Sequence, residues 1–566
     1  MKRTIGIIAA IVLVIATVTY FWPARSNTAD HTAAPNASSS GGQQQVTDVI
    51  KGVQGEQKNL IVIQLESYQS FVLGKSINGQ EITPNLNKLI EESVYFPHFY
   101  LQNGAGNTSD AEFMLNTSLF PFEPYRTVSA DGADSEYPSL PRMLKGSGYS
   151  TVTMHTNNAM FFNRKNLYSA LGFDRYLDKE FFGTNDYVAF GASDDELYGK
   201  GLDVLKEYQD KKQPFYAHMV SMTSHYPFTE PKKFQLLELP ELYEGNMAGN
   251  YLQATHYADA ALGRFIDQLK EAGLWDNTIL AIYGDHTGIQ LGMLDDKISA
   301  ALKDFLGRDY NQADALGVPF LIHDSSLKPE KKTVTGGHMD MLPTLLHVLG
   351  LSIPSSEAHL FGYDLFTGQE HPVGVRGAFA EPGTFVENGI LYNPKDETAL
   401  NVETDIKVEG QKDVYADTYD KVMASFKESD AYIASLPNRG DGFPLKLTLT
   451  EKTPLYSSPD LTASLNQSVP ASDVEQYEAR DDGWYRIKVK DNMVWIKPNH
   501  PIVEVWKNAT TKADVKTNLY KSPDDTTPVV TTLGPETTAA VSKEWVGTGW
   551  FCFYTWAGEL WGNVEK

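Results

Sequence analysis

The sequence predicts an α/β protein with a mainly parallel central sheet, preceded by one membrane-spanning helix and followed by two small β-barrels. Three observations lead to this prediction. Short apolar runs of the kind buried in parallel sheets alternate with amphipathic helical stretches through the middle of the chain. One apolar run of membrane-spanning length stands near the N-terminus. An aromatic-rich pattern occurs twice near the C-terminus.

The composition limits the classes of function. The chain has 566 residues, of which 42% are hydrophobic, so it can bury a sizeable core. The net charge of −24 argues against a nucleic-acid partner held by its phosphates, although an acidic protein can bind phosphate through a metal ion. The single cysteine, Cys552, excludes a disulfide-stapled scaffold and a cysteine-ligated zinc site.

Residues 1–22 have the features of a signal anchor. Lys2 and Arg3 precede an apolar run, and ~18 residues of helix cover about 27 Å of a bilayer. The alternative is a cleaved signal peptide, but residues 20–22 are aromatic where a cleavage site needs small residues. We therefore expect a single-pass protein of the cell membrane. After a flexible linker, residues 23–57, its catalytic domain would be extracytoplasmic.

Polar side chains follow two strand-like runs within the predicted domain, residues 58–395. One run ends on Glu66, and the other ends on Asp285 and His286. Ligands of open α/β sheets bind beyond the carboxyl ends of the strands, so we expect these side chains to share one edge. Singly, each has a structural explanation as a turn cap or a hydrogen-bond partner. Together they form a donor set that suits Mn²⁺, Mg²⁺ or Zn²⁺.

A glycine-rich loop leads into a helical pattern at residues 104–113. Asp110 and Glu112 fall in the first turn, where acidic side chains suit the positive end of a helix, and Thr108 and Ser109 stand at the junction. One interpretation is an ordinary N-cap made by either hydroxyl. The other is a phosphate-binding loop in which a metal-bound hydroxyl loses its proton and becomes a nucleophile.

Five motifs resemble the lipoteichoic acid synthase family, a sulfatase-like branch of the alkaline phosphatase superfamily. They are IQLES at 63–67, GNTSDAEF at 106–113, MHTNN at 154–158 with NR at 163–164, SHYP at 224–227, and YGDH at 283–286. The resemblance covers residues 58–395. It implies a sulfatase-like fold and a transferase that moves glycerol phosphate from phosphatidylglycerol, or a related phosphoglycerol lipid, to a teichoic acid acceptor.

The resemblance also implies which residues act on the phosphate. Thr108 matches the family's nucleophile, which would carry glycerol phosphate as a covalent intermediate. The ligands of a single Mn²⁺ ion, with Mg²⁺ as the alternative metal, would be Glu66, Thr108, Asp285 and His286. Asp110 and Glu112 would support the start of the helix rather than bind the metal.

A second group would hold the glycerol phosphate, namely His155, Phe162, Arg164 and His225. Arg164 would neutralise phosphate charge through a bidentate fork, and His225 or His155 would protonate the leaving alkoxide. Phe162 stands where the family's synthases carry a tryptophan, which keeps ring stacking but loses an N–H donor. The family's polymerising synthases have five transmembrane helices and this chain offers one, so polymer synthesis, priming and hydrolysis of a phosphodiester all stay open.

Two other motifs bear on the function. Residues 336–340 precede a helical pattern at 341–349, with Asp340 as the expected N-cap, and His338 is a weaker candidate for a metal or substrate residue. Sulfatases form formylglycine within a C/S-x-P-x-R motif. The nearest approach, SLPR at residues 139–142, has its arginine one position early, so a formylglycine sulfatase is not expected.

The C-terminal part contains a helical connector, residues 396–440, and two repeats, residues 441–500 and 501–566. LYSSPD at 455–460 recurs as LYKSPD at 519–524, and each repeat carries a similarly spaced pair of tryptophans. Repeats of ~65 residues with aromatic strands predict small β-barrels. They resemble bacterial SH3-like domains, which commonly bind cell wall, so peptidoglycan is a candidate partner. The alternative is that the aromatic residues serve only as barrel core. A wall-binding protein with an inert catalytic domain is a further alternative.

Overall fold

The structure is a computed structural model that describes residues 57–566. Gaps in this range fall at residues 123–127, 129–131, 134, 159–162, 352–358, 438–444, 480–482, 490–491, 505–509, 514–515, 536, 556–557 and 565–566. The predicted anchor lies outside the described residues, as does nearly all of the predicted linker. Within the described part of the chain, no helix is long and apolar enough to cross a membrane.

An eight-stranded sheet forms the centre of the first domain. In spatial order its strands are β13 (Glu330–Lys331), β4 (Val94–Tyr95), β12 (Phe320–His323), β11 (Thr278–Gly284), β1 (Asn59–Leu65), β10 (Phe215–Val220), β6 (Ser150–His155) and β7 (Arg175–Leu177). β1 pairs in parallel with β10 and β11, while β12 is antiparallel to both of its neighbours. The sheet is therefore mixed but mostly parallel. The reversal of β12 could not be predicted, because an apolar run reads the same in either direction.

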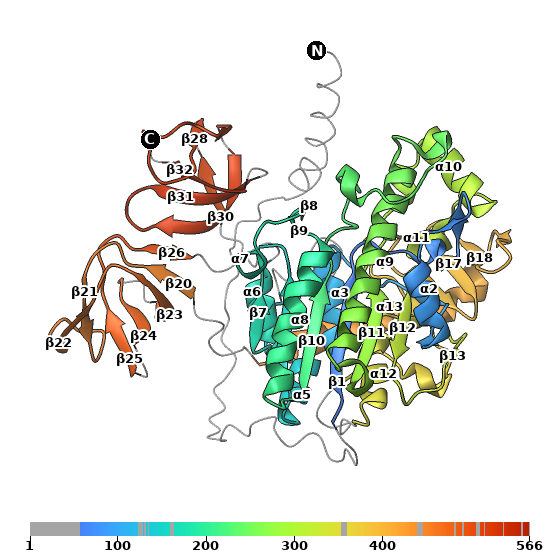
Figure 1. Cartoon of the computed structure of the whole chain (residues 1–566), viewed down its shortest axis with the longest axis horizontal. Coiled ribbons are helices and arrows are strands. Elements are labelled where there is room, and N and C mark those ends of the chain that lie inside the picture. The colour runs from blue at the N-terminus through green and yellow to red at the C-terminus, as the bar shows by residue number, and fades with distance from the viewer. Residues whose placement is uncertain are drawn as a thin grey trace. The chain divides into compact units, whose positions relative to one another are not determined.

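Helices cover both faces of this sheet (Figure 1). One face packs against α2 (Pro84–Glu91), α8 (Asp194–Asp210), α9 (Met247–Glu271) and α10 (Asp296–Leu306). The other face packs against α3 (Thr108–Thr117), α5 (Leu140–Gly146), α6 (Arg164–Leu171) and α12 (Met341–Val348). β1 contributes to both cores, with Ile61 and Ile63 on one face and Leu60 and Val62 on the other. This explains why its sequence is apolar throughout.

The strongly patterned helices and strands lie where the sequence predicted them. The amphipathic stretch 251–272 corresponds to α9, which starts earlier, at Met247, because the Asn246 side chain accepts a hydrogen bond from the backbone N–H of Gly249. The stretches 214–222 and 341–349 correspond to β10 and α12. α12 begins after Asp340 as expected, but this carboxylate accepts from the backbone N–H groups of Gly337 and Tyr363 instead of capping the helix.

A second, antiparallel sheet continues beyond residue 395. Its five strands are β15 (Val373–Gly374), β16 (Phe385–Glu387), β17 (Ile390–Asn393), β18 (Thr398–Asn401) and β19 (Lys407–Val408). The following helix, α13 (Lys412–Ser435), packs Val422 and Phe426 against Met114 of α3. The helical connector predicted over residues 396–440 is therefore only partly helical: α13 forms its second part, whereas its first part forms the strands β18 and β19. The described residues of this stretch belong to the packed body of the first domain.

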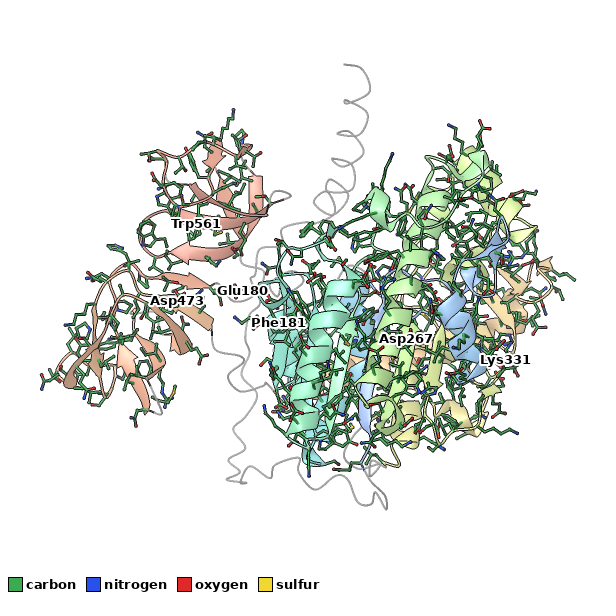
Figure 2. All side chains as sticks on the ribbon, in the orientation of Figure 1. Glu180, Phe181, Asp267, Lys331, Asp473 and Trp561 are labelled. Carbon is green, nitrogen blue, oxygen red and sulfur yellow. The ribbon has the colours of Figure 1, made fainter. Side chains whose placement is uncertain are left out.

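The C-terminal repeats are all-β. Their strands are β20 (Leu445–Thr448), β21 (Thr453–Tyr456), β22 (Ser464–Val469), β23 (Asp473–Ala479), β24 (Tyr485–Val489), β25 (Asn492–Ile496), β26 (Ile502–Glu504), β27 (Thr510–Ala513), β28 (Thr517–Leu519), β29 (Thr531–Leu533), β30 (Thr537–Trp545), β31 (Trp550–Thr555) and β32 (Gly558–Asn563). Figure 2 marks the first repeat by Asp473 and the second by Trp561. β26 pairs with both β20 and β30, so one hydrogen-bonded sheet spans both repeats.

Each repeat has its own core. Leu447 and Ile487 belong to one apolar cluster, and Leu519 and Phe553 belong to another. The repeated motifs form equivalent contacts: Tyr456 meets Trp484 edge to face at 4.9 Å, and Tyr520 meets Trp550 at 5.8 Å. The duplication predicted from the sequence is therefore visible in the packing, while the SH3-like identity of the repeats stays a prediction.

Candidate active site

The polar residues that follow β1 and β11 come together at one edge of the sheet. The two strands pair in parallel with Leu65 opposite Gly284, so Glu66 and Asp285 leave the sheet side by side. Ligand atoms of Glu66, Asp285 and His286 all lie within 4.8 Å of one another, and all three residues are buried. The predicted convergence of these side chains is confirmed.

Thr108 brings a hydroxyl to the same place from the N-terminus of α3. Its Oγ1 is 3.3 Å from Glu66 Oε2 and 3.3 Å from His286 Nε2. The His286 Nδ1–H donates to the carbonyl of Thr287 at 3.0 Å, which fixes the ring so that Nε2 faces Thr108. Three oxygen-bearing side chains and one imidazole nitrogen thus converge, and this donor set fits a hard or borderline divalent cation.

The electrostatics of this cluster favour a bound cation. Burial raises the pKa of Asp285 to about 8, and the nearby charge of Glu66 adds to the shift. Burial opposes the charge on His286, but Asp285 and Glu66 raise its pKa to about 10. The buried carboxyl groups of Glu66 and Asp285 are therefore stabilised as carboxylates by a nearby positive charge. A divalent ion would supply this charge in place of the proton on the His286 imidazole.

The loop before Thr108 is shaped by Asp110. Its Oδ2 accepts hydrogen bonds of 2.9 Å from the backbone N–H groups of Gly104 and Gly106. A Cβ on Gly106 would lie 2.1 Å from Asp110 Oδ1, so this position has room only for glycine. The N-cap of α3 is Asn107, at φ 45° and without a side-chain cap bond, so neither Thr108 nor Ser109 serves as the cap. The Thr108 hydroxyl is thereby left to the ligand cluster.

Gln64 connects the metal-type cluster to α3. This buried residue of β1 donates from Nε2 to Asp285 Oδ2 and to the carbonyl of Thr108, both at 3.2 Å. Its Oε1 accepts from the Tyr283 hydroxyl and lies 3.1 Å from His218 Nε2. The amide is therefore fully bonded, and it fixes Asp285 and Thr108 relative to each other.

The substrate-side residues reach the same edge from β6, α6 and the loop after β10. His225 Nε2 lies 3.9 Å from Glu66 Oε1. Arg164, at the start of α6, donates from Nε to Glu112 Oε1 at 2.9 Å. Burial works against the Arg164 charge, but the Glu112 carboxylate keeps the pKa of the guanidinium above its usual range. Phe162 lies outside the described residues.

His155 does not suit the role of general acid. It ends β6, and its Nδ1–H donates to the carbonyl of Val220 at 2.9 Å. Burial, followed by the charge of Arg164, lowers the pKa of His155 to about 3, so the ring is neutral near pH 7. The sequence left two histidines open for protonating the leaving group, and His225, whose Nε2 lies 3.9 Å from Glu66 Oε1, is the better placed candidate.

His338 contacts the end of β11 next to the candidate site. It is fully buried, and its Nε2–H donates to the carbonyl of Gly284, the residue before Asp285, at 2.9 Å. Burial lowers the pKa of His338 to about 4, which keeps the ring neutral. Its contact with the strand end makes it a residue that positions Asp285.

Sequence reasoning missed the supporting roles of Gln64 and His218, and it left Glu112 without a partner. A signal for the first two exists, because each is a polar residue inside an otherwise apolar buried strand. Such a residue must find a hydrogen-bond partner within the core. No comparable signal connects Glu112 with Arg164, which are far apart in the sequence.

Comparison with known proteins supports this description of the fold. The sulfatase family profile matches residues 58–351, and the chain belongs to the sulfatase family. Its relatives there include lipoteichoic acid synthases, as the five motifs predicted. Lipoteichoic acid synthase 1 of Bacillus subtilis (strain 168) is 35% identical over 391 residues, 67% of this chain and 57% of the relative. Lipoteichoic acid synthase of Staphylococcus aureus (strain USA300) is 34% identical over 360 residues, 62% of this chain and 54% of the relative. The chain thus spans about half the length of the curated relatives it matches.

Solved structures show the same fold. The lipoteichoic acid synthase LtaP from Listeria monocytogenes is 36% identical with a TM-score of 0.63, over 68% of this chain and 94% of that one. A protein of the alkaline phosphatase superfamily from Vibrio parahaemolyticus is 21% identical with a TM-score of 0.54, over 68% and 90% of the two chains, and shows the fold alone.

Membership of the sulfatase family does not imply that Ser139 is converted to formylglycine. Ser139 is buried and donates to the carbonyl of Leu171, while Pro141 lies within α5. These residues serve packing, and the hydroxyl beside the metal-type cluster is that of Thr108.

Proposed function

We propose that this protein is a metal-dependent phosphoglycerol transferase that uses Thr108 as its nucleophile. The observation that carries the proposal is the position of Thr108 Oγ1, 3.3 Å from both Glu66 and His286 at the N-terminus of a buried helix. The names of the related synthases point to glycerol phosphate as the transferred group. Phosphatidylglycerol, or a related phosphoglycerol lipid, is the proposed donor and a teichoic acid chain the proposed acceptor.

Mn²⁺, or Mg²⁺ in its place, would be held by Glu66, Thr108, Asp285 and His286, where it supplies Lewis-acid stabilisation of the phosphate charge. Thr108 attacks the donor phosphorus, and its hydroxyl proton is released to water, since a bound metal would make this hydroxyl more acidic. Diacylglycerol leaves, and the glycerol phosphate stays on Thr108.

Arg164 and the helix N-terminus stabilise the negative charge that develops on the phosphate oxygens. His225 donates a proton to the leaving alkoxide and takes one from the glycerol hydroxyl that enters next. The neutral ring of His155 orients the substrate. Phe162 would stack on the transferred group, although a phenyl ring offers it no hydrogen bond.

The proposed setting is the outer face of the cell membrane, with residues 1–22 as a single-pass anchor. The C-terminal repeats would hold the enzyme against peptidoglycan as SH3-like domains. Retention of the full chain on purified peptidoglycan, compared with a chain ending at residue 437, tests this role. Equal retention of the two proteins would remove it.

The proposed activity is tested by incubating the purified full chain with phosphatidylglycerol vesicles and Mn²⁺. We expect wild type to release diacylglycerol and Thr108→Ala to lose at least a thousandfold in rate. Thr117→Ala, at the far end of the same helix, is the matched control and should keep most of the activity. Release of free glycerol phosphate without polymer would favour the alternative, a phosphodiesterase that passes the group to water. If no diacylglycerol is released under any condition, both the transferase and the phosphodiesterase hypotheses are wrong, and a wall-binding protein is favoured.

A further inference from the structure

A short hairpin stands at the rim of the candidate active site. β8 (Tyr187–Val188) pairs with the antiparallel β9 (Gly191–Ala192). Thr156, which directly follows β6, donates its hydroxyl to the carbonyl of Ala192 at 2.8 Å. A Cβ on Gly191 would lie 2.4 Å from Thr156 Oγ1, so the hairpin backbone rests directly on the strand end that carries His155.

The hairpin turn places Phe190 beside a substrate-side residue. The rings of Phe190 and His225 meet edge to face with their centroids 4.9 Å apart. Phe190 is nevertheless 45% exposed, and Ala189 before it has φ 49°, a conformation that residues with a Cβ rarely adopt. Strained turns that hold a large apolar side chain in solvent are typical of contact sites.

Other large apolar side chains are exposed on segments bonded to this hairpin. Tyr187 is 44% exposed, and the ammonium of Lys179 on α7 (Lys179–Phe182) lies 5.0 Å from its ring centroid. Phe181, on the same short helix, is 42% exposed and labelled in Figure 2. Leu236 is 46% exposed and follows η4 (Lys232–Phe234). An ion pair between Lys233 of η4 and Asp186, the residue before β8, connects this segment to the hairpin. We call Phe181, Tyr187, Phe190 and Leu236 the apolar rim.

The charges around the apolar rim balance. Its segments and the first turns of α8 carry four lysines and six carboxylates: Lys179, Lys200, Lys232, Lys233, Asp178, Glu180, Asp186, Asp194, Asp195 and Glu196. Of the six carboxylates, Asp194 is buried and Asp195 pairs with Arg264 of α9, which leaves four carboxylates to balance the four lysines. Two of these lysines form ion pairs within the group, Lys233 with Asp186 and Lys200 with Glu196. In a chain with a net charge of −24, this neutral region can approach an anionic bilayer without the repulsion that the acidic remainder meets.

We propose that the apolar rim inserts into the interfacial layer of the lipid bilayer that supplies the donor. This inference rests on the proposed function, since a lipid donor is what brings acyl chains to this site. Aromatic side chains favour the membrane–water interface, where one side of the ring is apolar and the other is wet. Phe190 would contact the glycerol backbone and first methylenes of the donor lipid, and the rest of the rim would contact the surrounding bilayer.

A donor comparison tests the inference on the reconstituted full chain. The rate of diacylglycerol release is measured with long-chain phosphatidylglycerol in vesicles, and with short-chain phosphatidylglycerol dissolved as monomers. For Phe190→Ser and Tyr187→Ser we expect the ratio of the two rates to fall about tenfold, because only the vesicle donor requires the rim to enter the bilayer. Ile406→Ser changes an apolar side chain between β18 and β19 that is even more exposed, at 61%, and as the control it should leave the ratio within twofold. An unchanged ratio in the rim variants would overturn the inference.

A second measurement, fluorescence quenching, detects contact with the membrane without requiring catalysis. Brominated lipids in the vesicles should quench the fluorescence added by Phe190→Trp, and they should not quench that added by Ile406→Trp. The quenching should persist in high salt, because the rim carries no net charge to be screened. Absence of extra quenching, or its loss in salt, would contradict insertion whatever the activity of the enzyme. Quenching in a protein that releases no diacylglycerol would support the membrane contact and count against the proposed function.

Discussion

At the scale of single residues, Gln64 connects the candidate site although it is not among the proposed ligands of the metal or the phosphate. Its amide makes four contacts, to Asp285, Thr108, Tyr283 and His218. Supporting residues of this kind set the affinity of a metal site, because they orient the ligands before the ion arrives.

Replacing Gln64 by glutamate keeps the shape of the side chain but turns the amide donor toward Asp285 into a carboxylate. We expect Gln64→Glu to weaken Mn²⁺ binding about tenfold or more, since like charges then face each other. Isothermal titration of the purified protein with Mn²⁺ measures this. Gln268→Glu, on the exposed side of α9, is the control, and equal affinities of the two variants would contradict the role of Gln64.

Glu230 makes stability depend on pH away from the active site. Both of its carboxylate oxygens are buried without a hydrogen-bond partner among the described residues. Burial, and then the charge of Asp194, raises the pKa of Glu230 to about 8. The folded protein therefore keeps this proton where the unfolded chain has lost it, so stability falls as pH rises between the ordinary pKa and the raised one.

We expect the free energy of unfolding of wild type, relative to Glu230→Gln, to fall by on the order of 2–4 kcal/mol from about pH 5 to about pH 8. Denaturant unfolding at the two pH values measures the difference. Glu238→Gln, an exposed neighbour in the same segment, should follow wild type. A parallel pH dependence in wild type and Glu230→Gln would show that the Glu230 carboxyl is ionised in the fold.

At the scale of elements, α3 joins the proposed nucleophile to the arginine that we propose to bind the phosphate. Thr108 begins the helix, and Glu112, one turn later, bonds Arg164 Nε at 2.9 Å and accepts from the Tyr168 hydroxyl. Every residue of α3 is buried, so the helix is held by the sheet on one side and by α13 on the other. Thr108 and Arg164 therefore keep a fixed relation to each other.

Glu112→Gln should break this relation. Removing one partner of a buried ion pair leaves the charge of Arg164 uncompensated, which destabilises a fold by about 3–5 kcal/mol. We expect a lower unfolding midpoint in denaturant and a loss of diacylglycerol release at temperatures where the variant is still folded. Glu91→Gln, at the exposed end of α2, should change neither quantity. Retention of wild-type stability by Glu112→Gln would refute the pairing.

Elements also show what the sequence was able to predict. Glu66, Asp285 and His286 were predictable because each follows an apolar strand, and parallel strands end at a common edge. Gln64 and Glu112 were not, because their partners come from distant parts of the chain that only the fold brings together. The packing of α13 on α3 was missed for the same reason: Val422 and Phe426 mark an apolar stripe without saying what covers it.

At the scale of the whole molecule, one catalytic domain of the sulfatase family is followed by a duplicated all-β region with two separate cores. The proposed catalytic residues lie at the strand ends of its mixed sheet. The neutral apolar rim contrasts with the acidic remainder of the chain, and this contrast suits the proposed membrane-bound substrate.

The most direct test of the central claim is mass spectrometry of the full chain after acid quenching in the presence of phosphatidylglycerol and Mn²⁺. We expect the peptide that contains Thr108 to gain the mass of one glycerol phosphate group, and the corresponding peptide of Thr108→Ala to gain nothing. Release of diacylglycerol without an adduct on Thr108, or an adduct on a different residue, would contradict the account.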